Sequence, residues 1–203
     1  MADAGGMYER LSVHQRITPM VNRYAVHALG AGGQEGALIA FAQQKRMALK
    51  EEITFYAGED RSEPPLFAFK ARTRLDVSAG HDVTGPGGEQ IGWFTKQFRR
   101  SLTRSTWTLG CPALGLEAVG TERSQGVAIV RRIWNVVLED VPGPWRFHFD
   151  FRTDDGVLVM SSERRRTLRD AYDVELPQLP GGERLDWRLG AAMAVALDAL
   201  QSR

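Results

Sequence analysis

The chain has 203 residues, of which 43% are hydrophobic and 25% are charged, a composition typical of a soluble globular protein. Its net charge of +1 argues against a globally basic nucleic-acid-binding protein, so any basic surface must be local. The single cysteine, Cys111, excludes an internal disulfide and fits a reducing cytosol. We expect a cytoplasmic protein, because the first residues lack the apolar stretch of a secretory signal and no segment is long enough to be transmembrane.

The predicted elements are mostly short strands. About a dozen segments alternate apolar and polar residues, or are rich in β-branched and aromatic residues, and turn residues separate them. In chain order they cover residues 10–16, 23–29, 37–44, 52–57, 65–72, 75–84, 89–96, 105–109, 115–120, 145–151, 156–160 and 167–176. Their spacing of roughly ten residues predicts an all-β sandwich or barrel.

A glycine-rich stretch, GAGGQEG at residues 30–36, lies between two of these predicted strands. A dinucleotide-binding loop would need a helix directly after it, with the N-terminus at the pyrophosphate. Another strand follows instead, so we interpret residues 30–36 as a hairpin loop.

Two or three helices interrupt the strands. Residues 124–138 place Val130, Ile133, Trp134 and Val137 on one stripe, which predicts an amphipathic surface helix. Residues 44–52 predict a short helical turn. The third helix covers residues 185–201, near the end of the chain.

This last helix has no polar face, since every residue from Leu189 to Leu197 is apolar or glycine. Such a helix must be buried in a large core or in a membrane, and a membrane span needs about 20 apolar residues. A barrel of about twelve strands is wide enough to enclose a helix about 10 Å across. We therefore predict a mainly β fold, a closed antiparallel barrel around this helix, whose core positions are Leu189, Met193, Val195 and Leu197.

No repeat, low-complexity tract or long linker divides the chain, which predicts one domain over residues 1–203, with residues 1–20 as a partly flexible lead-in. Asp198 is the one carboxylate well inside the terminal helix. An unpaired charge in a core is very costly, so we expect Asp198 to emerge from the barrel into solvent.

The sequence resembles the tubby-like superfamily, specifically its phospholipid scramblase and LURP-one-related branch. Residues 41–56, 91–109, 123–134, 168–176 and the terminal helix carry the resemblance through their order and spacing. It implies a closed twelve-stranded barrel around a hydrophobic C-terminal helix. The sequence departs from the scramblases in two respects, since it has no clustered aspartates before the last helix and only one cysteine, so neither calcium binding nor lipid attachment is implied.

A run of basic residues without an acid is the strongest functional pattern. Lys96, Arg99, Arg100 and Arg104 lie within nine residues, and Arg131 and Arg132 follow further along. Together on one face they would attract anionic lipid at roughly 1 kcal/mol per cation. The aromatic residues between them, Trp93, Phe94 and Phe98, would then insert at the interface. The simpler interpretation is that these charges are solvated on the outer face of the barrel.

No catalytic motif, cofactor motif or metal-ligand set is recognised. Cys111 has no identifiable base beside it, and the four histidines lack the spacing of zinc-binding helices. His81 with Asp82, and His148 with Asp150, are interpreted as structural hydrogen-bonded pairs.

Three functions are compatible with this pattern. The first is a non-enzymatic domain that binds anionic phospholipid, such as phosphoinositide, at the inner membrane surface. The second is a scaffold for an unidentified protein partner. The third, a carrier of a small apolar ligand, requires the terminal helix to lie outside the barrel.

Overall fold

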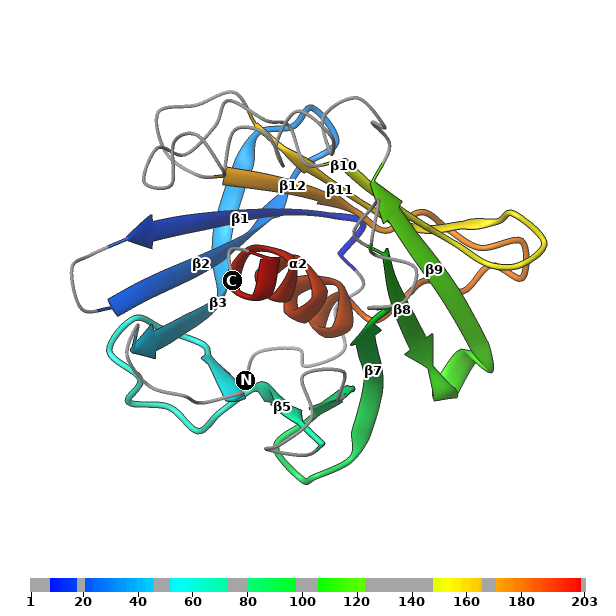
Figure 1. Cartoon of the computed structure of the whole chain (residues 1–203). Helices are drawn as coiled ribbons and strands as arrows, with labels where there is room; N and C mark the ends of the chain where they lie inside the picture. The colour runs from blue at the N-terminus through cyan, green and yellow to red at the C-terminus, as the bar shows by residue number, and fades with distance from the viewer. Residues whose placement is uncertain are drawn as a thin grey trace, which may run out of the picture.

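The computed structural model describes residues 8–17, 21–45, 52–72, 80–97, 106–122, 148–165 and 171–201. In these residues, twelve strands enclose one helix (Figure 1). The strands are β1 (Arg10–Ile17), β2 (Val21–Leu29), β3 (Glu35–Lys45), β4 (Glu52–Tyr56), β5 (Phe67–Ala71), β6 (His81–Thr84), β7 (Gln90–Lys96), β8 (Thr106–Cys111), β9 (Leu116–Glu122), β10 (His148–Arg152), β11 (Leu158–Arg164) and β12 (Ala171–Glu175). A 3₁₀ turn, η1 (Pro112–Leu114), joins β8 to β9, and the helix is α2 (Trp187–Gln201).

The strands form a closed antiparallel barrel. Each strand pairs with its neighbours in sequence, and β1 pairs with β12 to close the wall. The closing register runs from Arg10 opposite Glu175 to His14 opposite Ala171. The predicted barrel is confirmed, and the glycine-rich stretch before residue 35 is the turn of the β2–β3 hairpin.

Helix α2 fills the interior of the barrel. The predicted core positions are buried, with 0% exposure for Leu189, Met193 and Val195 and 4% for Leu197. The wall comes so close to the helix that a side chain on Gly92 would meet Leu189 at 2.5 Å and the carbonyl oxygen of Gly110 at 2.7 Å. Glycine is therefore required at that point of β7.

The helix begins at a capping aspartate. Asp186 Oδ1 accepts a hydrogen bond from the backbone N–H of Arg188 at 2.9 Å, and its carboxylate also pairs with the Arg188 guanidinium. An acceptor at this position satisfies one of the N–H groups that the first turn leaves free.

The structure differs from the sequence-based expectations at two segments. Residues 10–17 of the expected lead-in form the barrel strand β1. Of the predicted helical turn at residues 44–52, Gln44 and Lys45 belong to β3 and Glu52 to β4. The remainder of that turn and the predicted helix at 124–138 lie outside the described residues.

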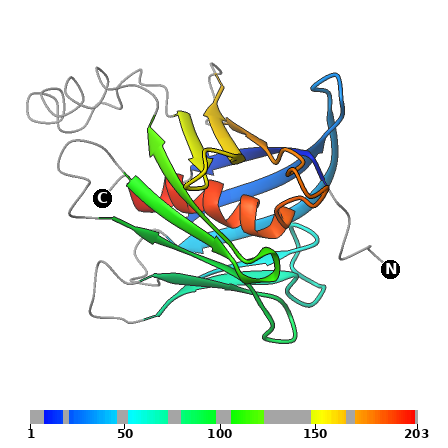
Figure 2. The same cartoon turned by 90° about the vertical axis from the view of Figure 1, so that its right-hand side faces the viewer.

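The barrel has two distinct ends. We call the end at which α2 begins the proximal end, and the end at which α2 finishes the distal end. The described turns after β2, β4, β6, β8 and β10 lie at the proximal end, whereas β1, β3, β5, β7, β9 and β11 finish at the distal end (Figure 2). The two ends differ in their charged residues.

Replacing Met193 by Asp is expected to prevent folding, because it places a charge at a position with 0% exposure and no partner of opposite charge is built for it. The measurement is thermal unfolding followed by circular dichroism, together with the yield of monodisperse protein. Ala113→Asp adds the same charge at an exposed position of η1 and should leave the transition unchanged. A Met193→Asp protein that melts cooperatively near the wild-type temperature would contradict the enclosed helix.

Candidate functional site

The turns at the proximal end are acidic. They contain eight acidic residues and two basic residues, namely Glu59, Asp60, Glu63, Glu89, Asp154, Asp155, Glu183 and Asp186 against Arg61 and Arg184. Their side chains are at least partly exposed. The proximal end is therefore an unfavourable surface for an anionic ligand.

The distal end carries more positive charge. The three strand residues nearest this end, together with the adjoining residue where it is described, include eight basic residues and six acidic ones. The basic residues are Arg16, Arg23, Lys45, Lys70, Arg72, Lys96, Arg164 and Arg165, and the acidic ones are Glu52, Asp82, Glu122, Asp150, Glu163 and Asp173. The charge of the barrel is thus divided between its two ends.

Several of the distal cations are already paired with carboxylates. Arg72 binds both oxygens of Asp82, with a shortest distance of 2.7 Å, and its guanidinium lies 5.5 Å from the centre of the Trp93 ring. Arg165 binds both oxygens of Asp173, at 2.7 and 2.8 Å. These pairs hold the strand ends in register and leave less positive charge for a ligand.

Of the predicted lipid-binding residues, the structure describes Lys96. Its Nζ lies 5.7 Å from the centre of the Trp107 ring, and Trp107 belongs to the core, so Lys96 points toward the interior of the barrel. Arg99, Arg100, Arg104, Arg131 and Arg132 lie outside the described residues. The described ends that flank them, Gln97, Thr106, Glu122 and His148, are all at the distal end.

Of the three aromatic residues expected at an interface, Trp93 and Phe94 face opposite sides of the wall, and Phe98 lies outside the described residues. Phe94 is fully buried in the core, so the prediction that it inserts into a membrane is wrong. Trp93 points outward and covers Gly110, whose side-chain position its indole occupies. Strand alternation between neighbouring residues explains the difference.

A tyrosine pair holds Asp198 inside the distal end. The Tyr24 hydroxyl donates to Asp198 Oδ2 at 3.0 Å, and the Tyr172 hydroxyl donates to Oδ1 at 2.5 Å. The Gln15 amide donates to the Tyr24 oxygen at 3.3 Å. Asp198 is partly exposed, so the expectation that it reaches solvent is confirmed in part, but it missed the two phenols from β2 and β12 that bind the carboxylate.

Burial and the Asp198 carboxylate both act on Tyr24. Burial is the larger cause and the negative charge of Asp198 the second, and together they raise the pKa of Tyr24 above its ordinary value. The phenol thus remains a proton donor.

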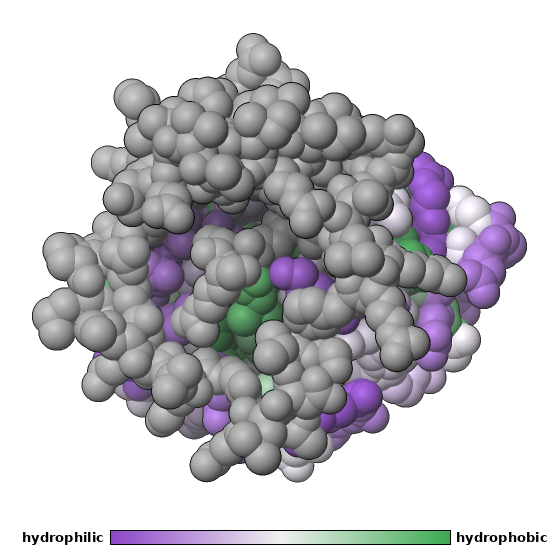
Figure 3. Space-filling view, in the orientation of Figure 1, coloured by the Kyte–Doolittle hydropathy of each residue, from purple (hydrophilic) through white to green (hydrophobic). Residues whose placement is uncertain are grey.

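Gln44 also lies in this region of the wall, where it is buried and stands opposite Asn22. In Figure 3 apolar surface lies recessed at the centre of the distal end, with hydrophilic residues beside it.

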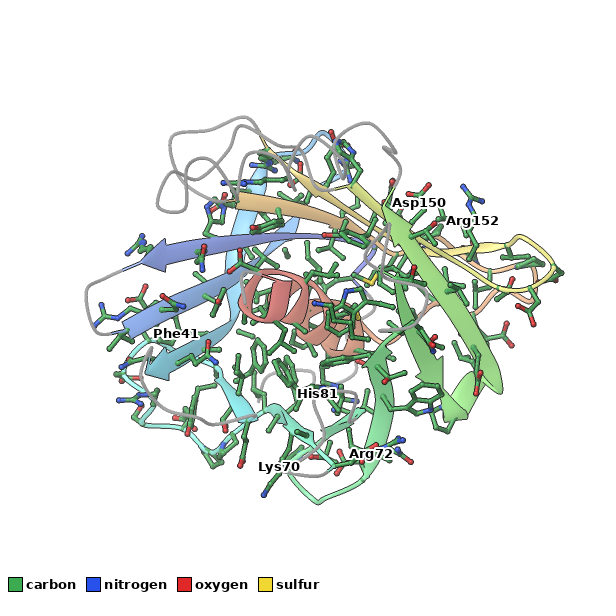
Figure 4. The ribbon with its side chains drawn as sticks, viewed as in Figure 1. Phe41, Lys70, Arg72, His81, Asp150 and Arg152 are labelled. Carbon is green, nitrogen blue, oxygen red and sulfur yellow. The ribbon has the colours of Figure 1, made fainter. Side chains whose placement is uncertain are left out.

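His81, labelled in Figure 4, is a second inward-facing polar residue at this end. Its ring stacks on Phe94, with the ring centres 5.1 Å apart, and meets Phe69 edge-on at 5.9 Å. Within the described part of the chain, its buried Nδ1 has no hydrogen-bond partner. Burial lowers the pKa of His81 to about 4, although Asp82 opposes the shift. The expected His81–Asp82 pair is wrong, since Asp82 binds Arg72 and Gln90.

On the outer face, Ser12, His14 and Glu35 are arranged like a hydrolase triad but cannot act as one. Ser12 Oγ and Glu35 Oε2 both contact the same imidazole nitrogen, Nε2 of His14, at 2.9 and 2.7 Å. A proton relay needs the serine on one ring nitrogen and the carboxylate on the other. His27 Nδ1 lies 3.5 Å from Glu35, and His148 Nε2 lies 3.5 Å from Glu163.

Neither the cysteine nor a metal-ligand cluster provides a site in the described residues. Cys111 is buried, and burial raises the pKa of its thiol. No group of three His, Cys, Asp or Glu side chains in the described ranges is placed to hold a metal ion. Within those ranges, no helix has both the length and the hydropathy needed to cross a membrane.

No family model matches the chain, and no curated protein matches it.

Sequence reasoning missed Arg16 and Arg23, which stand directly opposite each other on β1 and β2. Both lie in segments that were predicted as strands. The signal was the spacing of the two predicted strands, since antiparallel pairing of residues 10–16 with residues 23–29 places Arg16 opposite Arg23. Tyr24 and Tyr172 had no such signal, because their meeting depends on the depth at which α2 sits in the barrel.

Removing one phenol or the carboxylate is expected to destabilise the protein. Hydrogen bonds to a charged group contribute about 1.5–3 kcal/mol, so Tyr24→Phe and Asp198→Asn should each lower the free energy of unfolding by about that amount. In the double variant the losses should not add, with a coupling of about 0.5–3 kcal/mol. Chemical denaturation measures this cycle. Tyr56→Phe on β4 is the control for loss of a hydroxyl, and additive losses would contradict the pairing.

His81 makes stability depend on pH in a defined window. Its folded-state pKa is about 4 and its unfolded value about 6.5, so the unfolded chain binds the extra proton between these values. Stability should therefore fall as the pH drops from 6.5 toward 4. Denaturation curves of His81→Phe, which keeps the stack on Phe94, should be flatter than wild type over this range. Parallel curves for the two proteins would contradict the shift.

Proposed function

We propose that this chain is a non-enzymatic intracellular barrel domain of the tubby-like superfamily that binds anionic phospholipid, in particular phosphoinositide, with its distal end. The observation that carries the proposal is the division of charge between the two ends of the barrel. An anionic membrane repels the acidic proximal turns and attracts the distal end, which defines one orientation of the barrel at the surface.

The composition of the connecting sequence supports the same orientation. The segments that join the strands at the distal end, residues 18–20, 46–51, 73–79, 98–105, 123–147 and 166–170, contain twelve basic and five acidic residues. The basic ones are Arg46, Lys50, Arg74, Arg99, Arg100, Arg104, Arg123, Arg131, Arg132, Arg146, Arg166 and Arg169, and the acidic ones are Glu51, Asp76, Glu139, Asp140 and Asp170. Most of the basic sites predicted from sequence belong to these segments.

The enclosed helix weighs against a carrier of an apolar ligand. Residues 191–197 of α2 are all buried, so the helix occupies the space in which a carrier would hold its cargo. A protein-interaction scaffold is the remaining alternative, and it is separated from lipid binding by the experiment below.

Liposome co-sedimentation tests the proposal. The full chain should pellet with vesicles that contain phosphoinositide but not with neutral vesicles, and pelleting should weaken as salt rises, because salt screens exposed charges. Arg99→Glu combined with Arg100→Glu should reduce pelleting by at least tenfold, since it reverses two charges.

The control reverses one exposed charge at the opposite end, in Arg61→Glu, and is compared with the single variant Arg99→Glu. Arg61 lies in the proximal turn after β4, and its side chain is exposed. The Arg61 variant should bind vesicles as the wild type does, whereas Arg99→Glu should bind less. Equal losses in both single variants, or no pelleting at low salt, would contradict the proposal, and the latter result would favour a protein partner.

A further inference from the structure

Arg16 and Arg23 form a cross-strand pair of like charge on the outside of the barrel. They are direct partners in the register of β1 and β2. Their neighbours Gln15 and Tyr24 are buried and hydrogen-bonded to each other on the inner side. Because successive side chains of a strand alternate between the two faces, Arg16 and Arg23 both point outward.

Neither guanidinium is neutralised. Both side chains are exposed, and within the described part of the chain neither has a hydrogen-bond or ion-pair partner. This differs from Arg72 and Arg165, which lie near the same end and each bind an aspartate through two nitrogens. The pair is therefore an exception among the arginines at the distal strand ends.

Like charges directly opposite each other destabilise an antiparallel pair of strands. Substitution of either residue by threonine, a good strand former, would remove the repulsion. The next outward residue on β1, His14, provides no negative charge to offset it. Local rules of strand pairing are broken most often where function requires it.

We propose that Arg16 and Arg23 together bind one phosphate dianion of the phosphomonoester type. Directly opposed residues have Cβ atoms about 5 Å apart, which lets two guanidinium forks converge on one tetrahedral oxyanion. Arginine suits this task because its planar donors match phosphate oxygens in pairs. The inference rests on the proposed function and deepens it, since it names the chemical group that the distal end would recognise and two residues that bind it.

A ligand that binds only the folded state stabilises it in proportion to ln(1 + [L]/Kd). Inorganic phosphate should therefore raise the melting temperature of the full chain above that measured in chloride at equal ionic strength. Arg16→Gln and Arg23→Gln should each abolish this difference. Without phosphate at low salt, each variant should melt at or above the wild-type temperature, because the repulsion between the strands is gone.

The control is Arg61→Gln, which removes one exposed positive charge at the proximal end and should keep the full phosphate effect. If either variant of the pair retained the phosphate effect, or if the wild type showed none beyond chloride, the phosphate clamp would be wrong. A variant that melts below the wild type in chloride would also contradict it, since the pair would then be stabilising in itself.

Vesicles distinguish a lipid headgroup from a free phosphorylated compound. At equal surface charge, vesicles with a phosphoinositide carry a phosphomonoester, whereas those with phosphatidylserine do not. A headgroup ligand predicts that Arg16→Gln and Arg23→Gln lose the excess binding to phosphoinositide while binding to phosphatidylserine remains. A phosphate effect without any pelleting would support the clamp for a soluble ligand and overturn the membrane proposal. Pelleting without a phosphate effect would support the membrane proposal and overturn the clamp.

Discussion

The need to cover α2 on all sides determines the architecture. A helix with no polar face is stable only inside an enclosure, and here the inner faces of twelve strands provide it. The alanines of α2 and Gly92 of β7 let the wall approach the helix closely. Residues 191–197 of α2 are buried against that wall, so we expect binding at the outer face and at the two ends of the barrel.

This constraint is also why the fold could be predicted. Alternation of apolar and polar residues gave the strands, and the wholly apolar terminal helix required them to close around it. What the sequence could not indicate is how far α2 extends through the barrel. Asp198 meets Tyr24, which is 174 positions away in the sequence, and that contact depends on the axial position of the helix and on the strand register together. An isolated carboxylate in an apolar helix was for that reason assigned to solvent, although two phenols hold it.

The candidate site was less predictable than the fold, because basic residues that are close in the sequence can face different sides of the wall or be paired with carboxylates of other strands. Lys96 belongs to the most basic run of the chain, but alternation along β7 turns it toward Trp107. Arg72 is exposed and basic, but Asp82 from the adjacent strand neutralises it. Arg16 and Arg23 are seven positions apart in the sequence, and their register across β1 and β2 is what gives the pair its significance. The net charge of a surface region depends on which strands pair there. The order of residues along the chain does not show this pairing.

The position of Asp198 bears on where at the distal end an anion can bind. The last turn of a helix carries about half a negative charge on its free carbonyl groups, and Asp198 adds a carboxylate beside it. Both lie within the barrel, behind the strand ends. An anionic group therefore meets repulsion on the axis of the barrel, where α2 ends, and attraction on the outer surface of the wall. That distribution favours the outward-facing Arg16 and Arg23 over the recess at the centre, and it directs an anionic ligand to the rim of the barrel rather than to its mouth.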